Sequence, residues 1–162
     1  MFVDKRSGKI ALVAHCLLNQ NSRAVGLAKR SSVINEIVEF LVRKKIGIIQ
    51  MSCPELAYVG VSRQPQTREQ YNNAKFRRCC RKIAEEIANL VQEYAKAGVK
   101  LEMVLGVEGS PSCGVNEISG IFMEELRLKL EEHGISVPFY GVSLEHLRDD
   151  IAELEKLIKL EA

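Results

Sequence analysis

The sequence lacks tryptophan, and aromatic residues make up only 6% of its 162 residues. Platforms that stack single-stranded nucleic acid are built from exposed aromatic side chains, so the composition does not favour that class of protein. A strong excess of charge is also missing, since the formal net charge is +2. A chain so close to neutrality is not drawn to nucleic acid or to an anionic membrane. We therefore expect no nucleic-acid partner.

Long hydrophobic runs are missing as well. No segment approaches the roughly 18 apolar residues that span a bilayer. Residues Met1 to Lys9 lead into a short apolar run that ends at His15, which is not the pattern of a signal peptide. We expect no membrane partner and a cytoplasmic location. In the cytoplasm, five cysteines indicate metal or redox chemistry more than structural disulfides.

Four short apolar runs alternate with longer amphipathic segments. The runs predict strands at Ile10–His15, Ile46–Met51, Leu101–Val107 and Val137–Val142. The amphipathic segments predict helices over 32–44, 68–97, 119–132 and from 143 to the C-terminus. Thr67 and Gln70 have the spacing of a capping box at the start of the second helix, and Gly98 is placed to end it.

This order of elements defines the fold class. Strict alternation predicts an α/β protein with a four-stranded, mainly parallel Rossmann- or flavodoxin-like sheet and helices on both faces. We expect residues 1–162 to form a single three-layer domain, because no repeat, low-complexity tract or linker interrupts the pattern. Two loops, Cys16–Ser31 and Ser52–Thr67, are longer than a simple turn, and loops of this kind in compact domains are usually functional.

Three of the five cysteines follow predicted strands. Cys16 comes directly after the first strand, Cys53 comes shortly after the second, and Cys113 lies in the loop after the third. Because parallel strands end at one edge of a sheet, we expect these thiols to meet where open α/β sheets bind ligands. Cys79 and Cys80 are neighbours on a predicted helix, point about 100° apart and receive no role.

The spacing of the cysteines limits the kind of site. No C-x-x-C pair is present, so neither a four-cysteine zinc site nor a ferredoxin-type motif is indicated. Three thiolates can hold three irons of a 4Fe–4S cluster and leave the fourth iron open as a Lewis acid. His15, beside Cys16, fits an edge histidine better than a fourth ligand.

Two other readings stay open. One is a non-catalytic module that binds a metal or cluster. The other is a cysteine-nucleophile hydrolase that uses Cys16. A phosphatase loop places five residues between cysteine and arginine, whereas six residues separate Cys16 from Arg23, which counts against the hydrolase.

Three segments carry a resemblance to a known family. They are Cys16-Leu17-Leu18 with Arg23 and Gly26 downstream, then Cys53-Pro54-Glu55, and then Ser110-Pro111-Ser112-Cys113-Gly114. These segments resemble the TudS-like family, which is related to 2-thiouracil desulfurase and was long labelled only as a domain of unknown function. The resemblance covers roughly residues 9–115, and its last segment is the most specific.

The resemblance implies a 4Fe–4S cluster held by Cys16, Cys53 and Cys113. It implies that the open iron takes sulfur from a thiocarbonyl-type small molecule, such as a thiolated nucleobase, while water replaces the sulfur at carbon. It also suggests that an acidic residue and a serine move protons, and the matching positions are Glu55 and Ser112 or Ser110. We expect an exposed open iron to be lost in aerobic preparations. A homo-oligomer is compatible with the sequence.

Polar residues in the same loops are candidates for substrate binding. Asn19 and Arg23 can hold the polar edge of a substrate, since arginine offers a planar fork of donors to a carbonyl or carboxylate. Glu108 is a further candidate at the rim. The sequence departs from the family pattern at Asn19, where glycine is usual, and in the shortened segment Val115–Gly120. Because these loops face the substrate in the analogy, cluster binding is better supported than thiouracil as the substrate.

Overall fold

The computed structural model describes residues 2–161, and their four strands form one sheet. The strands are β1 (Lys9–Val13), β2 (Gly47–Gln50), β3 (Lys100–Val107) and β4 (Phe139–Val142). They lie in the order β2-β1-β3-β4, and all three pairings are parallel. The prediction of a parallel α/β sheet is therefore confirmed.

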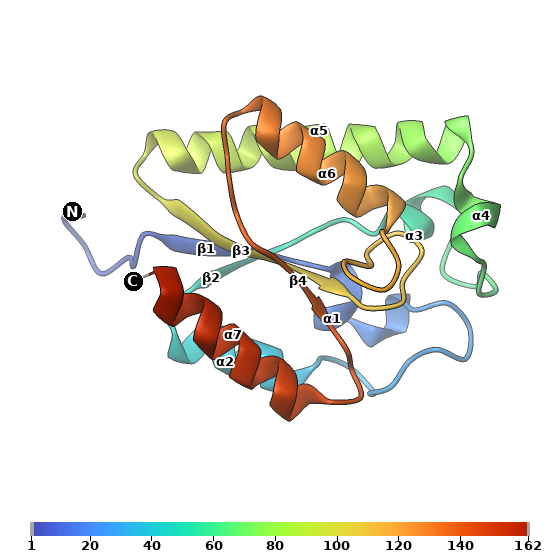
Figure 1. Ribbon diagram of the computed structural model, residues 1–162, viewed down its shortest axis with the longest axis horizontal. Helices are drawn as coiled ribbons and strands as arrows, with labels where there is room; N and C mark the ends of the chain where they lie inside the picture. Colours follow the sequence, from blue (N-terminus) through green and yellow to red (C-terminus); the bar gives the residue numbers. More distant parts are fainter. Residues whose placement is uncertain (1, 162) are drawn as a thin grey trace.

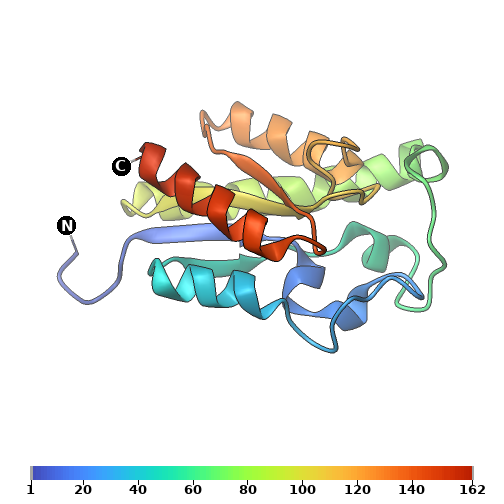
Figure 2. The same cartoon turned by 60° about the horizontal axis from the view of Figure 1, so that its bottom comes forward.

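Helices cover both faces of the sheet. Helices α5 (Ala74–Lys96) and α6 (Ile121–Glu132) lie on one face, and α2 (Asn35–Arg43) and α7 (Leu147–Glu161) lie on the other (Figure 1 and Figure 2). On α5, side chains at steps of three and four face the interior, which explains the amphipathic pattern. Its buried residues are Phe76, Cys80, Ala84, Ile87, Ala88 and Val91. The three layers match the expected fold class.

The centre of the sheet forms the core of the molecule. Ala11, Leu12 and Val13 of β1 have no exposed surface, and Val104 and Leu105 of β3 are equally buried. Strands covered on both faces read as continuous apolar runs, because neither face meets water. This packed centre fixes the carboxyl ends of β1, β2 and β3, from which the three cysteine-bearing loops leave.

The helix predicted over 68–97 is divided in two. Helix α4 (Arg68–Tyr71) begins with the predicted capping box, in which Thr67 and Gln70 exchange side-chain to backbone hydrogen bonds. The chain then leaves the helix, and Asn73 Oδ1 accepts a hydrogen bond from the Phe76 N–H at 2.9 Å to start α5. Asparagine side chains compete for backbone groups and so favour caps over helix interiors, which explains the interruption.

Both long loops contain short helices that the sequence did not predict. The first loop holds α1 (His15–Leu18) and the 3-10 helix η1 (Gln20–Ser22), and the second holds α3 (Pro54–Tyr58). Proline suits the first position of α3, because its missing N–H would have no partner there. These turns give the loops fixed side-chain positions.

Helix α7 begins later than the predicted start at Ser143. Ser143 Oγ accepts a hydrogen bond from the His146 N–H at 2.9 Å and donates one to Asp150 at 2.9 Å. The serine therefore caps a turn that precedes the helix, and Leu144 adopts a positive φ of 68° inside that turn.

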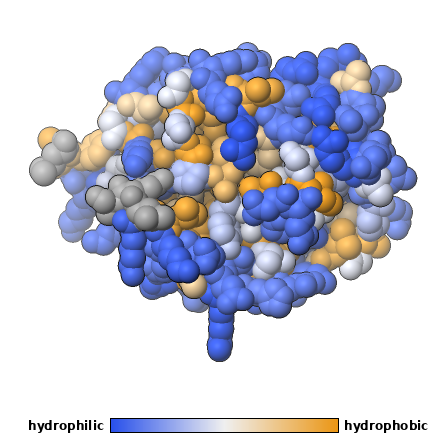
Figure 3. Space-filling view, in the orientation of Figure 1, coloured by the Kyte–Doolittle hydropathy of each residue, from blue (hydrophilic) through white to orange (hydrophobic). Residues whose placement is uncertain are grey.

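The face of the molecule drawn in Figure 3 is mainly hydrophilic, with hydrophobic residues exposed between the hydrophilic ones. Within residues 2–161, no helix combines the length and apolarity that crossing a membrane requires.

Candidate active site

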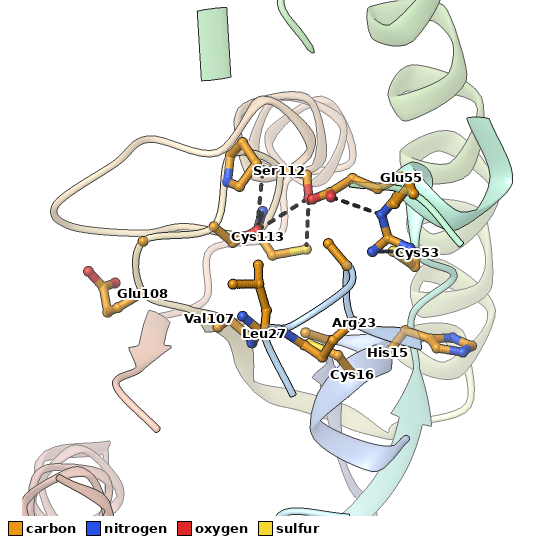
Figure 4. Close-up of a pocket in the computed structure, with 16 residues that line it drawn as sticks. His15, Cys16, Arg23, Leu27, Cys53, Glu55, Val107, Glu108, Ser112 and Cys113 are labelled. Atoms are coloured by element: carbon orange, nitrogen blue, oxygen red, sulfur yellow. Dashed lines mark hydrogen bonds and ion pairs between the residues drawn. The ribbon is translucent and has the colours of Figure 1, made fainter. Parts of the chain in front are cut away.

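A cavity of about 240 Å³ opens at the carboxyl edge of the sheet, where the loops after β1, β2 and β3 meet. Cys16, Cys53 and Cys113 all line it, and Figure 4 shows them around the same space. The structure thus brings together the three cysteines that the sequence places at one rim. Cys79 and Cys80 lie on α5 and do not line this cavity, and all five cysteines are free thiols.

Each cysteine is positioned by a local turn that follows its strand. Cys16 lies in the first turn of α1. Two residues earlier, the Ala14 N–H donates a hydrogen bond to the Leu105 carbonyl at 2.9 Å and so ties this turn to β3. Cys53 is the N-cap of α3, and its sulfur accepts a hydrogen bond from the Leu56 N–H at 3.4 Å. Hydrogen bonds from backbone N–H groups therefore fix the positions of Cys16 and Cys53 relative to the ends of their strands.

The loop that carries Cys113 folds tightly back on itself. A Cβ at Gly120 would lie 2.2 Å from the Ser112 carbonyl oxygen, so only glycine fits at that point. Ser110 Oγ accepts hydrogen bonds from the backbone N–H groups of Ser112 at 3.3 Å and Cys113 at 3.0 Å. The hydroxyl of Ser110 is therefore engaged in shaping the turn. Ser112 Oγ lies 3.4 Å from Ser110 Oγ and also contacts Glu55 of α3.

A buried chain of polar contacts links the second and third loops. Ser112 Oγ donates a hydrogen bond to Glu55 Oε2 at 2.5 Å, and Arg63 Nε donates to Glu55 Oε1 at 3.2 Å. Arg63 also donates to the Gly60 carbonyl at 3.1 Å and lies 4.0 Å from the Cys53 sulfur. Glu55 and Arg63 are each only 7% exposed. Two of the predicted proton-moving residues are thus in direct contact.

Sequence reasoning assigned no role to Arg63 or to Tyr71. Arg63 lies in the same loop as Glu55, and the signal for it was its match to the family pattern after Cys53-Pro54-Glu55. Tyr71 ends α4, is 1% exposed, and packs on Phe76 with ring centroids 4.7 Å apart. Burial, and then the nearby charge of Glu55, raise the pKa of Tyr71 to about 12. No pattern in the sequence distinguished Tyr71 from a core aromatic residue.

The first loop brings Arg23 to the cavity. Gln20 is buried and ties the loop together, because its Nε2 donates to the Cys16 carbonyl and its Oε1 accepts from the Lys29 N–H, both at 2.8 Å. Arg23 lines the cavity beside Cys16, and its Nη1 is buried without a hydrogen-bond partner. The Val25 N–H bonds the Arg63 carbonyl at 3.0 Å, which joins the first loop to the second.

Two predicted substrate-binding residues have their side chains engaged elsewhere. Asn19 does not line the cavity, and its Oδ1 accepts a hydrogen bond from the Asn21 N–H to cap η1. Glu108 lines the cavity, but its carboxylate accepts from the N–H groups of Asn116 and Glu117 at 3.0 and 3.1 Å. Figure 4 shows this carboxylate turned away from the three cysteines. Both side chains hold loops in place, and substrate binding by them stays a prediction.

Burial raises the pKa of all three thiols. The pKa of Cys16 rises to about 11, although the guanidinium of Arg23 opposes the shift. The pKa values of Cys53 and Cys113 also rise through burial, and for Cys113 the two other cysteines add to the effect. Thiols of this kind are protonated near neutral pH and are weak nucleophiles, which disfavours a hydrolase that uses Cys16. A bound metal displaces such protons.

Three cysteine thiols on one cavity are a donor set of the kind that iron–sulfur clusters use. Within residues 2–161, no group of three or more His, Cys, Asp or Glu side chains forms a ready site for one metal ion. Three sulfurs that each bind a different iron lie farther apart than three ligands of one ion. Thiolate sulfur is the donor that selects such clusters, and the guanidiniums of Arg23 and Arg63 suit the negative charge of a thiolate-bound cluster.

Comparison with known proteins extends the resemblance beyond these segments. Residues 8–154 match the family model described as "Putative 2-thiouracil desulfurase". The chain belongs to this family. The desulfurase family match therefore includes α6 and β4, which lie outside the segments that carry the resemblance. An uncharacterized protein of Methanocaldococcus jannaschii is 37% identical over 153 residues, which cover 93% of this chain and 97% of the relative. No solved structure shows a significant match.

Proposed function

We propose that the protein is an iron–sulfur-dependent desulfurase that removes sulfur from a thiocarbonyl-type small molecule, such as a thiolated nucleobase. The observation that carries this proposal is the convergence of Cys16, Cys53 and Cys113 on one cavity beside the Ser112–Glu55 hydrogen bond. Membership of the desulfurase family supports it.

Cys16, Cys53 and Cys113 are the proposed ligands of a 4Fe–4S cluster. When bound there, the cluster supplies an open iron, a Lewis acid that polarises the carbon–sulfur bond of the substrate. Arg23 lies beside Cys16, and Arg63 lies 4.0 Å from the Cys53 sulfur. Their positive charges oppose the rise in pKa that burial causes in these thiols, and so favour the thiolate forms that bind metal.

The net reaction exchanges C=S for C=O, consumes one water and releases one hydrogen sulfide. In the proposed proton path, Glu55 accepts a proton from the attacking water through Ser112 Oγ and returns it to the departing sulfur by the same route. The 2.5 Å hydrogen bond from Ser112 to Glu55 supports this path. Arg63 acts as a positioning residue, because its Nε holds the other oxygen of the same carboxylate. Ser110 keeps the turn that presents Ser112.

Cluster binding is tested by anaerobic reconstitution with iron and sulfide. We expect the wild-type protein to gain the broad visible absorption of an iron–sulfide cluster, with about four irons per chain. The triple variant Cys16→Ala/Cys53→Ala/Cys113→Ala should gain none of it, whereas Cys79→Ala, a cysteine outside the cavity, serves as the matched control. A triple variant that takes up as much iron as the wild type would contradict the ligand assignment.

Turnover is tested by measuring sulfide released from 2-thiouracil by the loaded protein. We expect Ser112→Ala to keep the cluster absorption and to lose about 100-fold in kcat, because the path from water to Glu55 is interrupted. A Ser112→Ala protein with unchanged kcat would remove this residue from the proton path. A loaded protein that releases no sulfide from thiolated bases or thioamides would support the alternative, a non-catalytic cluster-binding module.

A further inference from the structure

Arg23 enters the cavity with a donor that the protein itself does not use. Its Nη1 is buried and has no hydrogen-bond partner, and none of the ion pairs found among residues 2–159 involves this arginine. Nearly all buried polar groups in folded proteins are hydrogen-bonded, so an unpaired nitrogen of a charged group is a rare exception. Because it lines the cavity, this donor is available to a molecule that enters.

The first loop is built to hold Arg23 in this position. Gln20 bonds the Cys16 carbonyl on one side of Arg23 and the Lys29 N–H on the other. After Arg23, the Leu27 N–H bonds the Ala24 carbonyl at 3.0 Å, and Gly26 supplies the positive φ of 84° that such a turn requires. These bonds anchor the loop on both sides of Arg23, although residues 25–32 are exposed.

The surroundings of Arg23 limit what can satisfy it. The residues that line the same cavity include the apolar Ala24, Leu27, Val107 and Pro111. Arg63 also lines it, but this arginine already donates to Glu55 and to the Gly60 carbonyl. A phosphate would need several converging donors, which these residues do not offer. A planar ring with one oxygen acceptor can accept a hydrogen bond from the guanidinium through its oxygen and pack its apolar face against the apolar residues.

We infer that Arg23 selects substrates whose ring carries an oxygen acceptor in addition to the thiocarbonyl group. This inference rests on the proposed desulfurase function and assigns the specificity of that same site. A thioheterocycle without this oxygen would leave the buried Nη1 of Arg23 unpaired. A site built to hydrogen-bond a substrate group discriminates strongly against the analogue that lacks it.

The test compares 2-thiouracil with pyrimidine-2-thione, which has the same ring and thiocarbonyl group but no oxo group. In cluster-loaded wild type, we expect kcat/KM to be at least about tenfold higher for 2-thiouracil. Arg23→Met should bring the two substrates within about twofold, mainly by raising KM for 2-thiouracil. Arg30→Met is the matched control, because Arg30 belongs to the same loop but pairs with Glu36 at the surface, and it should keep the discrimination.

Binding of the sulfur-free products gives a second measurement that needs no turnover. Isothermal titration should show uracil binding at least about tenfold more tightly than pyrimidin-2-one to wild type, and equally to Arg23→Met. Discrimination that survives Arg23→Met, or is absent from wild type, overturns the inference. So does an Arg23→Met protein that no longer takes up the cluster, since Arg23 would then serve the cluster. If loaded wild type releases no sulfide from either compound, the proposed function fails, and product binding still decides the inference.

Discussion

Two arginines reach the same cavity from two different loops, and they differ in how their donors are used. Arg63 donates to Glu55 and to the Gly60 carbonyl, and its side chain is 4% exposed. Arg23 lines the cavity from the loop after β1, and its buried Nη1 has no hydrogen-bond partner. The first arginine completes an internal network, whereas the second leaves a hydrogen bond unmade.

This difference distinguishes a part of the site whose hydrogen bonds are completed within the protein from a part that has a donor free for a ligand. A fully paired buried charge rigidifies its neighbours, and here it fixes the carboxylate that Ser112 contacts. An unpaired buried donor lowers the stability of the free protein, and this free energy is recovered when a ligand supplies the acceptor. The two arginines should therefore respond in opposite ways to the same substitution.

The largest effect is expected from Arg63→Met. This variant leaves the buried carboxylate of Glu55 without its counter-charge, so the free energy of unfolding should fall by about 3–5 kcal/mol. Urea unfolding of the cluster-free protein measures the change. Arg30→Met breaks an exposed pair whose side chains are 39% and 36% exposed, and it should change stability far less than Arg63→Met does. Equal losses in the two variants would show that the Glu55–Arg63 pair is not effectively buried.

A smaller effect of opposite sign is expected from Arg23→Met. The variant removes an unpaired buried donor and keeps an unbranched apolar chain, so the cluster-free protein should gain about 1 kcal/mol. The same urea experiment decides the sign. A loss as large as that of Arg63→Met would mean that Arg23 is paired within the protein, and the contrast between the two arginines would disappear.

The smallest effect concerns the reactivity of the thiols. In cluster-free wild type, alkylation of Cys16 should rise about tenfold per pH unit between about pH 7 and pH 9, because the pKa of this thiol is raised to about 11. Arg23→Met should slow alkylation of Cys16 severalfold, since the guanidinium lowers that pKa, and should leave Cys53 unchanged. Peptide mass spectrometry follows both sites. A rate for Cys16 that levels off near pH 8 would contradict the direction of the shift.

The convergence of Cys16, Cys53 and Cys113 could be predicted from sequence because it depends only on where parallel strands end. Apolar runs locate the strands, and parallel pairing sends all three carboxyl ends to one rim. The shared family segments point to the same three residues. Neither argument needs the conformation of the loops.

Side-chain partners could not be predicted in the same way. Asn19 and Glu108 are polar and near the rim, but each finds backbone N–H groups within its own part of the chain. Ser110 and Ser112 are two residues apart with the same chemistry, and only the turn geometry separates the one that accepts backbone bonds from the one that contacts Glu55. The break before Asn73 has a similar cause, because a side-chain cap outweighed a continuous apolar pattern.

The three cysteines follow three different strands, and this also sets the order in which the proposed cluster site can assemble. Cys16 and Cys53 emerge early during synthesis, but the third thiol is fixed only when β3 has paired and the Val107 N–H has closed on the Cys113 carbonyl. Iron delivered to a partly made chain would meet an incomplete set of ligands. Insertion of the proposed cluster would therefore follow folding, and the bound cluster would tie the ends of β1, β2 and β3 together against unfolding.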